Sequence, residues 1–194
     1  DMQDALIFIF RSLLDLYIIC FVLRLLLQWA RADFRNPLSQ FILRVTNPLV
    51  LPIRRVVPAL GTLDTATLLA ALALQVLATA VLVNVACVGS ADLLQLLGIA
   101  IIRLLQLTLR IYLFVILIYV VLSWISPGGY NPAANLLSAL AEPVLAPVRR
   151  IVPAIGGLDL SPLLVLIGIQ AVSMLLPVGR VMSRLVCTSI GQPL

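Results

Sequence analysis

The side chains of this sequence that could do chemistry are few, and most are charged groups inside apolar runs. The first run carries Arg11 and Asp15, which are four residues apart and therefore share one face of a helix. A later run carries Arg103, Gln106 and Arg110 as a polar stripe. We expect Asp15 to pair with Arg110, Arg11 or both. A charge near the centre of a membrane-spanning helix costs about 2.5–3.5 kcal/mol to insert into the bilayer, so it usually faces a partner. The pair would be a structural ion pair or part of an ion or proton path.

Groups for catalysis or metal binding are scarce. The chain has no His, which removes the commonest general base and metal ligand. Cys20, Cys87 and Cys187 are far apart and lack CxxC spacing, so we interpret them as small apolar residues in helices. Ser and Thr are scattered without a base beside them. We therefore expect a protein that is not an enzyme, with no catalytic residue, metal or cofactor.

The composition indicates the class of protein that holds these charges. Of 194 residues, 62% are apolar and 11% are charged, whereas soluble domains are roughly half apolar and a quarter charged. Crossing a bilayer as a helix takes about 20 apolar residues. Four segments meet this length: about 5–30, 64–87, 97–125 and 162–185, the last with Pro177 as a kink. The sequence thus predicts an all-α membrane protein with four transmembrane helices.

The chain also contains an internal repeat. A shift of 95 residues places Trp29 on Trp124 and Arg54-Arg55 on Arg149-Arg150 without a gap. From Pro48 to Asp64, 10 of 17 positions are identical to their counterparts. We divide the chain into repeat 1 (1–95) and repeat 2 (96–194). Because each has two spans, both enter the membrane in the same direction, related by a pseudo-twofold axis along its normal.

The segments between the spans of each repeat, 36–58 and 131–153, are predicted to lie in the membrane interface. Asn36 caps a helix that has Pro37 at its first position, and the counterpart begins at Asn131-Pro132. Apolar residues then recur at helical spacing over about three turns. Past this amphipathic helix, prolines are expected to break backbone hydrogen bonding and hold a bent, shallow path.

Each connection ends in one motif, NPLVLPIRRVVPALGTLD (47–64) or EPVLAPVRRIVPAIGGLD (142–159). Paired arginines at headgroup depth suit phosphate, which a guanidinium grips with two hydrogen bonds. We interpret the motif as a docking site for anionic lipid headgroups or a partner protein; the alternative is a topology signal that inserts into headgroups. The residues assigned to docking are Arg54, Arg55, Arg149, Arg150, Pro52 and Pro147. Arg24, near the end of the first span, is expected to extend to the interface.

The placement of arginines gives an orientation. The first connection holds Arg31, Arg35, Arg44, Arg54 and Arg55, and the loop at 89–92 has no basic residue. The positive-inside rule places both long connections in the cytoplasm and both termini in the periplasm, although Arg180 and Arg184 argue the other way. The net charge of +5 therefore indicates topology and lipid phosphate, with no nucleic acid as partner.

These motifs carry a family resemblance. DLY (15–17), LQWARADFRNPLSQF (27–41), SWISPGGYNP (123–132) and the two proline–arginine motifs resemble the YggT family of bacteria, called YlmG in Gram-positives, with relatives in plastids. The resemblance implies an integral inner-membrane protein linked to osmotic-stress tolerance, cell division and, in plastids, assembly of photosynthetic membrane complexes. A haem-related role proposed for some plastid relatives gains no support, since no His can ligate haem.

Two functions remain open on the sequence. The first is a scaffold, assembly factor or accessory subunit that binds another integral membrane protein or complex. The alternative is a small transporter or channel for ions or osmolytes, acting as a homo-oligomer. Partner identity, specific lipid and oligomeric state are not encoded in any motif.

Overall fold

The chain folds into helices throughout the part that the structure describes. This computed structural model describes residues 2–58, 64–86, 91–125, 131–152 and 159–183. Cys87, Cys187 and Arg184 lie outside these ranges. The helices are α1 (Met2–Trp29), α2 (Pro37–Val56), α3 (Thr65–Ala86), α4 (Leu93–Ile125), α5 (Pro132–Ile151), α6 (Ser161–Leu175) and α7 (Val178–Ser183).

Four stretches of helix are long and apolar enough to cross a membrane, which makes this a multi-pass membrane protein. They are Ala5–Trp29, Thr65–Val85, Leu93–Ile125 and Ser161–Val181. The predicted spans are confirmed, and the third helix begins four residues before its predicted start. The last span is interrupted at Pro177, which separates α6 from α7 as the kink prediction required.

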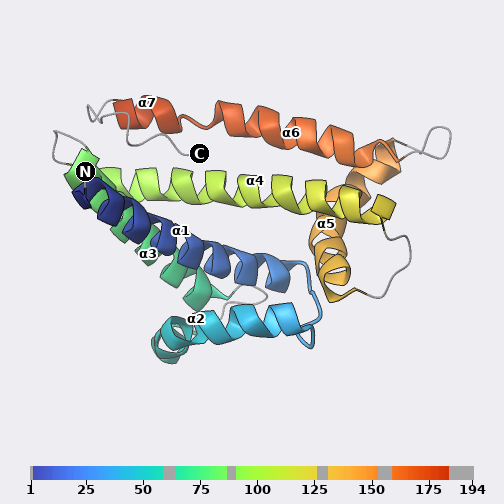
Figure 1. The fold of residues 1–194 in the computed structure, drawn as a ribbon, viewed down its shortest axis with the longest axis horizontal. Helices are drawn as coiled ribbons and strands as arrows, with labels where there is room; N and C mark the ends of the chain where they lie inside the picture. Colours follow the sequence, from blue (N-terminus) through green and yellow to red (C-terminus); the bar gives the residue numbers. More distant parts are fainter. Residues whose placement is uncertain (1, 59–63, 87–90, 126–130, 153–158, 184–194) are drawn as a thin grey trace.

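The helices of the two halves follow the same course. Figure 1 shows α1 and α4 starting at one end of the molecule and α3 and α6 returning toward it. The helix pairs α1·α3 and α4·α6 are in contact, and α3 packs on α4 to join the halves. In the same view α5 lies across the end of α4 and α6 (Figure 1).

Small residues allow the first half to pack closely. Ala66, Ala70 and Ala71 of α3 are buried against Phe21 of α1 and Val50 of α2. Alanine lets helix backbones approach each other where lipid gives no hydrophobic driving force for association. Contact with lipid also explains why many large apolar side chains on the outer faces stay exposed.

The prediction that prolines break the connecting segments is wrong. α2 runs as one 20-residue helix through Pro48 and Pro52, and α5 does the same through Pro143 and Pro147. In α2 both prolines are exposed, whereas Ile42, Thr46 and Val50 on the opposite face are buried. Packing of that face holds the backbone helical despite the lost hydrogen bonds, and Thr46 donates its hydroxyl hydrogen to the Ile42 carbonyl (2.8 Å). The arginine pairs therefore lie in the last turn of continuous helices.

Candidate functional site

Asparagine side chains fix the start of both connecting helices. Asn36 accepts a hydrogen bond from the Leu38 amide (3.0 Å), and Asn131 accepts one from the Ala133 amide (2.9 Å). These are the predicted N-caps, each followed by proline at the first helical position. Asn36 also donates its side-chain amide to the Pro132 carbonyl (2.7 Å), so the two helix starts are bonded to each other.

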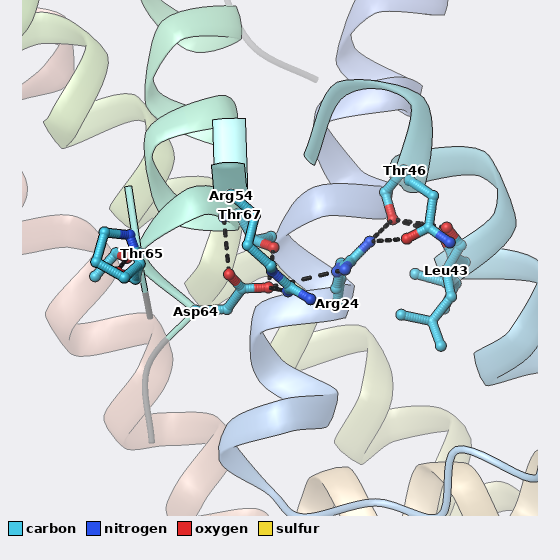
Figure 2. Close-up of polar contacts among 10 residues, drawn as sticks. Arg24, Leu43, Thr46, Arg54, Asp64, Thr65 and Thr67 are labelled. Atoms are coloured by element: carbon cyan, nitrogen blue, oxygen red, sulfur yellow. Dashed lines mark hydrogen bonds and ion pairs between the residues drawn. The ribbon is translucent and has the colours of Figure 1, made fainter. Parts of the chain in front are cut away.

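At the other end of α2, Arg54 folds back onto Asp64. The Arg54 guanidinium donates to the Asp64 carboxylate across ten residues of chain (Figure 2). Asp64 is 1% exposed and caps α3, because it accepts from the Thr67 amide (3.4 Å) and the Thr67 hydroxyl (2.6 Å). Its second role, as the partner of Arg54, was not predicted from the sequence.

Arg24 of α1 completes this cluster from the side of the bundle. Its guanidinium donates to Thr46 Oγ1 (2.7 Å) and Asn47 Oδ1 (2.9 Å), and it lies 3.8 Å from the Asp64 carboxylate (Figure 2). The residue is only 4% exposed. Arg24, expected to extend to the interface, reaches the connecting helix α2, where hydrogen-bond acceptors and the charge of Asp64 hold it inside the protein.

Repeat 2 builds the same cluster from different residues. Arg149 donates to Asp159 (2.8 Å), as Arg54 does to Asp64, and it also donates to Glu142 (3.0 Å). Tyr119, which stands 95 positions after Arg24, accepts a weaker hydrogen bond from Arg149 (3.4 Å). Glu142 stands where repeat 1 has Asn47. The arginine-to-aspartate contact is shared, and the residues around it have diverged.

This divergence reverses the net charge of the two clusters. Repeat 1 gathers two arginines and one aspartate, whereas repeat 2 gathers one arginine and two acids. The pKa values of the two aspartates are nevertheless shifted in the same direction. Burial would raise the pKa of Asp64, but hydrogen bonds from Thr67 and the charge of Arg54 outweigh it and hold that pKa below its usual value. Hydrogen bonds from Ser161 and Arg149 likewise outweigh burial and lower the pKa of Asp159.

Arg149 is held in its charged form. A hydrogen bond to Tyr119 is the largest cause that raises the pKa of its guanidinium, followed by the contacts with Asp159 and Glu142, while burial acts in the opposite direction. A guanidinium surrounded by these acceptors has little capacity left for a further anion.

The second arginine of each pair is placed differently from the first. Arg55 and Arg150 are exposed, and neither has a hydrogen bond or ion pair within the described part of the chain. Pro52 and Pro147 are exposed beside them. A surface hollow of about 240 Å³ is lined by Leu51, Arg54 and Arg55. The motif thus divides its arginines into one that holds the fold and one that faces outward.

The structure brings together part of the predicted intramembrane ion pair. Arg11 and Asp15 lie 3.8 Å apart on α1, and Arg103 is close enough for both charges to act on it. Arg103 also donates to Thr79 of α3 (3.4 Å). No ion pair joins Asp15 to Arg110 among the described residues, although the repeat places them at equivalent positions. The cluster therefore consists of Arg11, Asp15 and Arg103.

These clusters of charged side chains can bind charged groups. Within the described ranges, no group of three or more Cys, Asp and Glu side chains could hold a metal ion. Sequence reasoning missed the roles of Tyr119, Glu142 and Asp159 around Arg149. One signal could have found Asp159 and Asp64: in both copies an aspartate follows the first arginine of the pair by ten residues.

Comparison with known proteins connects this arrangement to a family. A family model described as CCB3/YggT matches the chain twice, over residues 3–85 and 98–180, which are offset by the same 95 residues as the repeat. An uncharacterised protein of Pseudomonas aeruginosa is 41% identical over 175 residues, covering 90% of this chain and 89% of the relative. A protein of Escherichia coli K12 named YggT is 37% identical over 173 residues, covering 89% of each. No solved structure matches the chain.

Proposed function

The chain belongs to the CCB3/YggT family, and from this membership and the arginine geometry we propose that it is a non-enzymatic scaffold or accessory subunit of a membrane complex. One observation carries the proposal. In both repeats the first arginine of the pair forms an ion pair with an aspartate of the same chain, whereas the second is exposed and makes no ion pair among the described residues. Such an arrangement presents a cation from a rigid support, which reduces the entropy lost when a partner binds.

We place the protein in the bacterial inner membrane, with α2 and α5 at the cytoplasmic interface and both termini in the periplasm. The common starting end of α1 and α4 supports two parallel repeats related by a pseudo-twofold axis (Figure 1). The concentration of arginines on the connections supports the orientation. In this placement Arg55 and Arg150 face the headgroups or the cytoplasmic surface of a neighbouring protein. A role in osmotic-stress tolerance or envelope organisation fits a protein that supports larger assemblies.

The transport alternative has weaker support. It depended on Asp15 pairing with Arg110 across α1 and α4, and that contact is absent among the described residues. The charges at Arg11, Asp15 and Arg103 instead form a compact cluster with Thr79 beside it. A cluster of this kind is typical of ion pairs that join helices within a membrane bundle.

Native mass spectrometry of the full chain tests the proposal. The tagged protein, expressed at native level, is extracted in a mild detergent and weighed intact. A second protein at fixed stoichiometry, lost in the double variant Arg55→Gln/Arg150→Gln and kept in the control Arg35→Gln, is the expected result. A species of 21.0 kDa or a multiple of it, in every variant, would overturn the accessory-subunit function.

A further inference from the structure

The two connections differ strongly in charge, although their helices α2 and α5 span equivalent residues. Residues 31–64 hold five arginines against two aspartates, a net charge of +3. The equivalent residues 126–159 hold two arginines, one glutamate and one aspartate, a net charge of zero. A juxtamembrane arginine contributes attraction to anionic lipid of about 1 kcal/mol. Repeat 1 is therefore the half that attracts anions.

Two arginines of the first connection, Arg44 and Arg55, lie on one exposed face of α2. Arg44, Pro48, Leu51 and Arg55 recur at i, i+4, i+7 and i+11, and all four are exposed. The hollow between Leu51, Arg54 and Arg55 is at the C-terminal end of this face. Its volume of about 240 Å³ is sufficient for a phosphate group with its attached ester carbons. In repeat 2 the positions of Arg44 and Leu51 are taken by Ala139 and Ala146.

An apolar surface adjoins this basic face. Phe41 is 61% exposed and Val56 is 82% exposed, with Leu38 and Pro52 exposed on the same side of α2. The equivalent part of α5 is partly covered: Leu136, the counterpart of Phe41, is half-buried, whereas Ile151, the counterpart of Val56, is exposed. A helix with basic residues beside exposed apolar ones accommodates a headgroup and an acyl chain together.

Repeat 2 also has a reason to reject an anion. The guanidinium of Arg149 is already bound to Glu142 and Asp159, and an arriving phosphate would meet both carboxylates. In repeat 1 the corresponding aspartate is buried and shared by Arg24 and Arg54, so the charge that remains at the surface is positive.

We propose that repeat 1 alone holds an anionic phospholipid, with its phosphate in the hollow between Arg54 and Arg55 and an acyl chain along Phe41 and Pro52. The inference rests on the interfacial placement of α2 proposed above. Arg44, about 16 Å from Arg55 along the helix axis, attracts the lipid without touching the same phosphate. Repeat 2 has the equivalent helix but binds no lipid phosphate at Arg150.

Native mass spectrometry of the purified full chain, without cell extract, tests this with lipids of stated headgroup. Phosphatidylglycerol is expected to give one retained lipid per chain, and phosphatidylcholine none at the same concentration. Arg55→Gln is expected to weaken retention about fivefold, the effect of one arginine, and the matched Arg150→Gln to leave it unchanged. Equal loss in both variants, or equal retention of both lipids, would overturn the proposal.

Two further arms keep the result unambiguous. Ala139→Arg with Glu142→Asn gives repeat 2 the residues that repeat 1 has at Arg44 and Asn47, and a second retained phosphatidylglycerol is expected; its absence would contradict the charge argument. Complete displacement of the lipid by millimolar inorganic phosphate would assign the hollow to a soluble anion and overturn a lipid site. No cellular partner is present in this lipid experiment. A negative result in it therefore does not bear on the accessory-subunit function, and a negative result with the cell-extracted protein does not bear on lipid binding.

Discussion

Tyr119 occupies in repeat 2 the position that Arg24 occupies in repeat 1, and each meets its own connecting helix at the cluster around an Arg–Asp contact. Arg24 brings a charge to Asp64, whereas Tyr119 brings an uncharged hydroxyl to Arg149. Two differences between equivalent positions, Tyr119 for Arg24 and Glu142 for Asn47, together change the sign of the cluster's net charge.

Asp64→Asn is expected to destabilise the protein far more than Asp159→Asn. Asp64 is 1% exposed and neutralises the buried Arg24, so its loss leaves a buried charge unpaired, at a cost of about 3–5 kcal/mol. The Asp159 side chain is 38% exposed, and an exposed pair contributes about 0–1 kcal/mol. Reversible unfolding in mixed micelles measures both. Equal losses would show that the Arg24–Asp64 contact does not form.

Stability is expected to fall on acidification. The folded-state pKa values of Asp64 and Asp159 lie below their usual range, so the unfolded chain takes up protons first. The stabilisation is present above the unfolded value of about 3.9 and is lost as pH falls through the folded values. We expect a constant melting temperature from pH 8 to about 5 and a decline below about 4. Asp64→Asn should flatten this decline, and an unchanged profile would contradict the assigned role of Asp64.

Arg24→Met and Tyr119→Phe separate the two clusters. Arg24→Met removes a buried charge but leaves Asp64 bound to Arg54, so the loss is expected to be smaller than that of Asp64→Asn. Tyr119→Phe removes one hydrogen bond of 3.4 Å and is expected to cost at most about 1 kcal/mol. The double variant Arg24→Met/Asp64→Asn should have a higher free energy of unfolding than the single variant Asp64→Asn, because the unpaired buried charge is gone. Strict additivity in that cycle would argue against direct coupling.

Pro52→Ala distinguishes a structural proline from a docking proline. Because Pro52 lies inside a continuous helix, alanine restores a backbone donor and is expected to raise the free energy of unfolding by up to about 3 kcal/mol. A fall in stability would instead indicate that the proline ring itself contributes to the packing of α2. If stability rises while a partner is lost from the purified complex, the proline serves docking.

Asp15 is expected to couple to Arg11 and Arg103 and not to Arg110. Double-variant cycles of Asp15→Asn with Arg11→Gln or Arg103→Gln should deviate from additivity, because these charges act on one another. The cycle with Arg110→Gln is the matched control and should be additive within about 0.5 kcal/mol. Coupling to Arg110 of similar size would restore the pair expected from the repeat.

The spans, the repeat and both asparagine caps could be predicted because hydropathy, identity at a fixed offset and Asn-Pro dipeptides are local signals. The burial of Arg24 could not be predicted, because its position in the first span suggests an exit to the interface. Its hydrogen-bond acceptors lie more than twenty residues away in the sequence. The continuous course of α2 through its prolines could not be predicted for a related reason. Local propensity favours a break in the helix, but packing of the opposite face overrides it. The partner of Asp15 depended on helix rotation, which a repeat offset does not determine.

The hydrogen bond from Asn36 to Pro132 joins residues that are 96 positions apart, one from each half of the chain. Each connecting helix therefore begins against the start of the other. A half-length chain carrying one repeat would lack this contact and much of the α3–α4 packing surface. It could regain them only from a second copy standing beside it in the same orientation, so a single-repeat version of this protein should exist as an obligate parallel dimer.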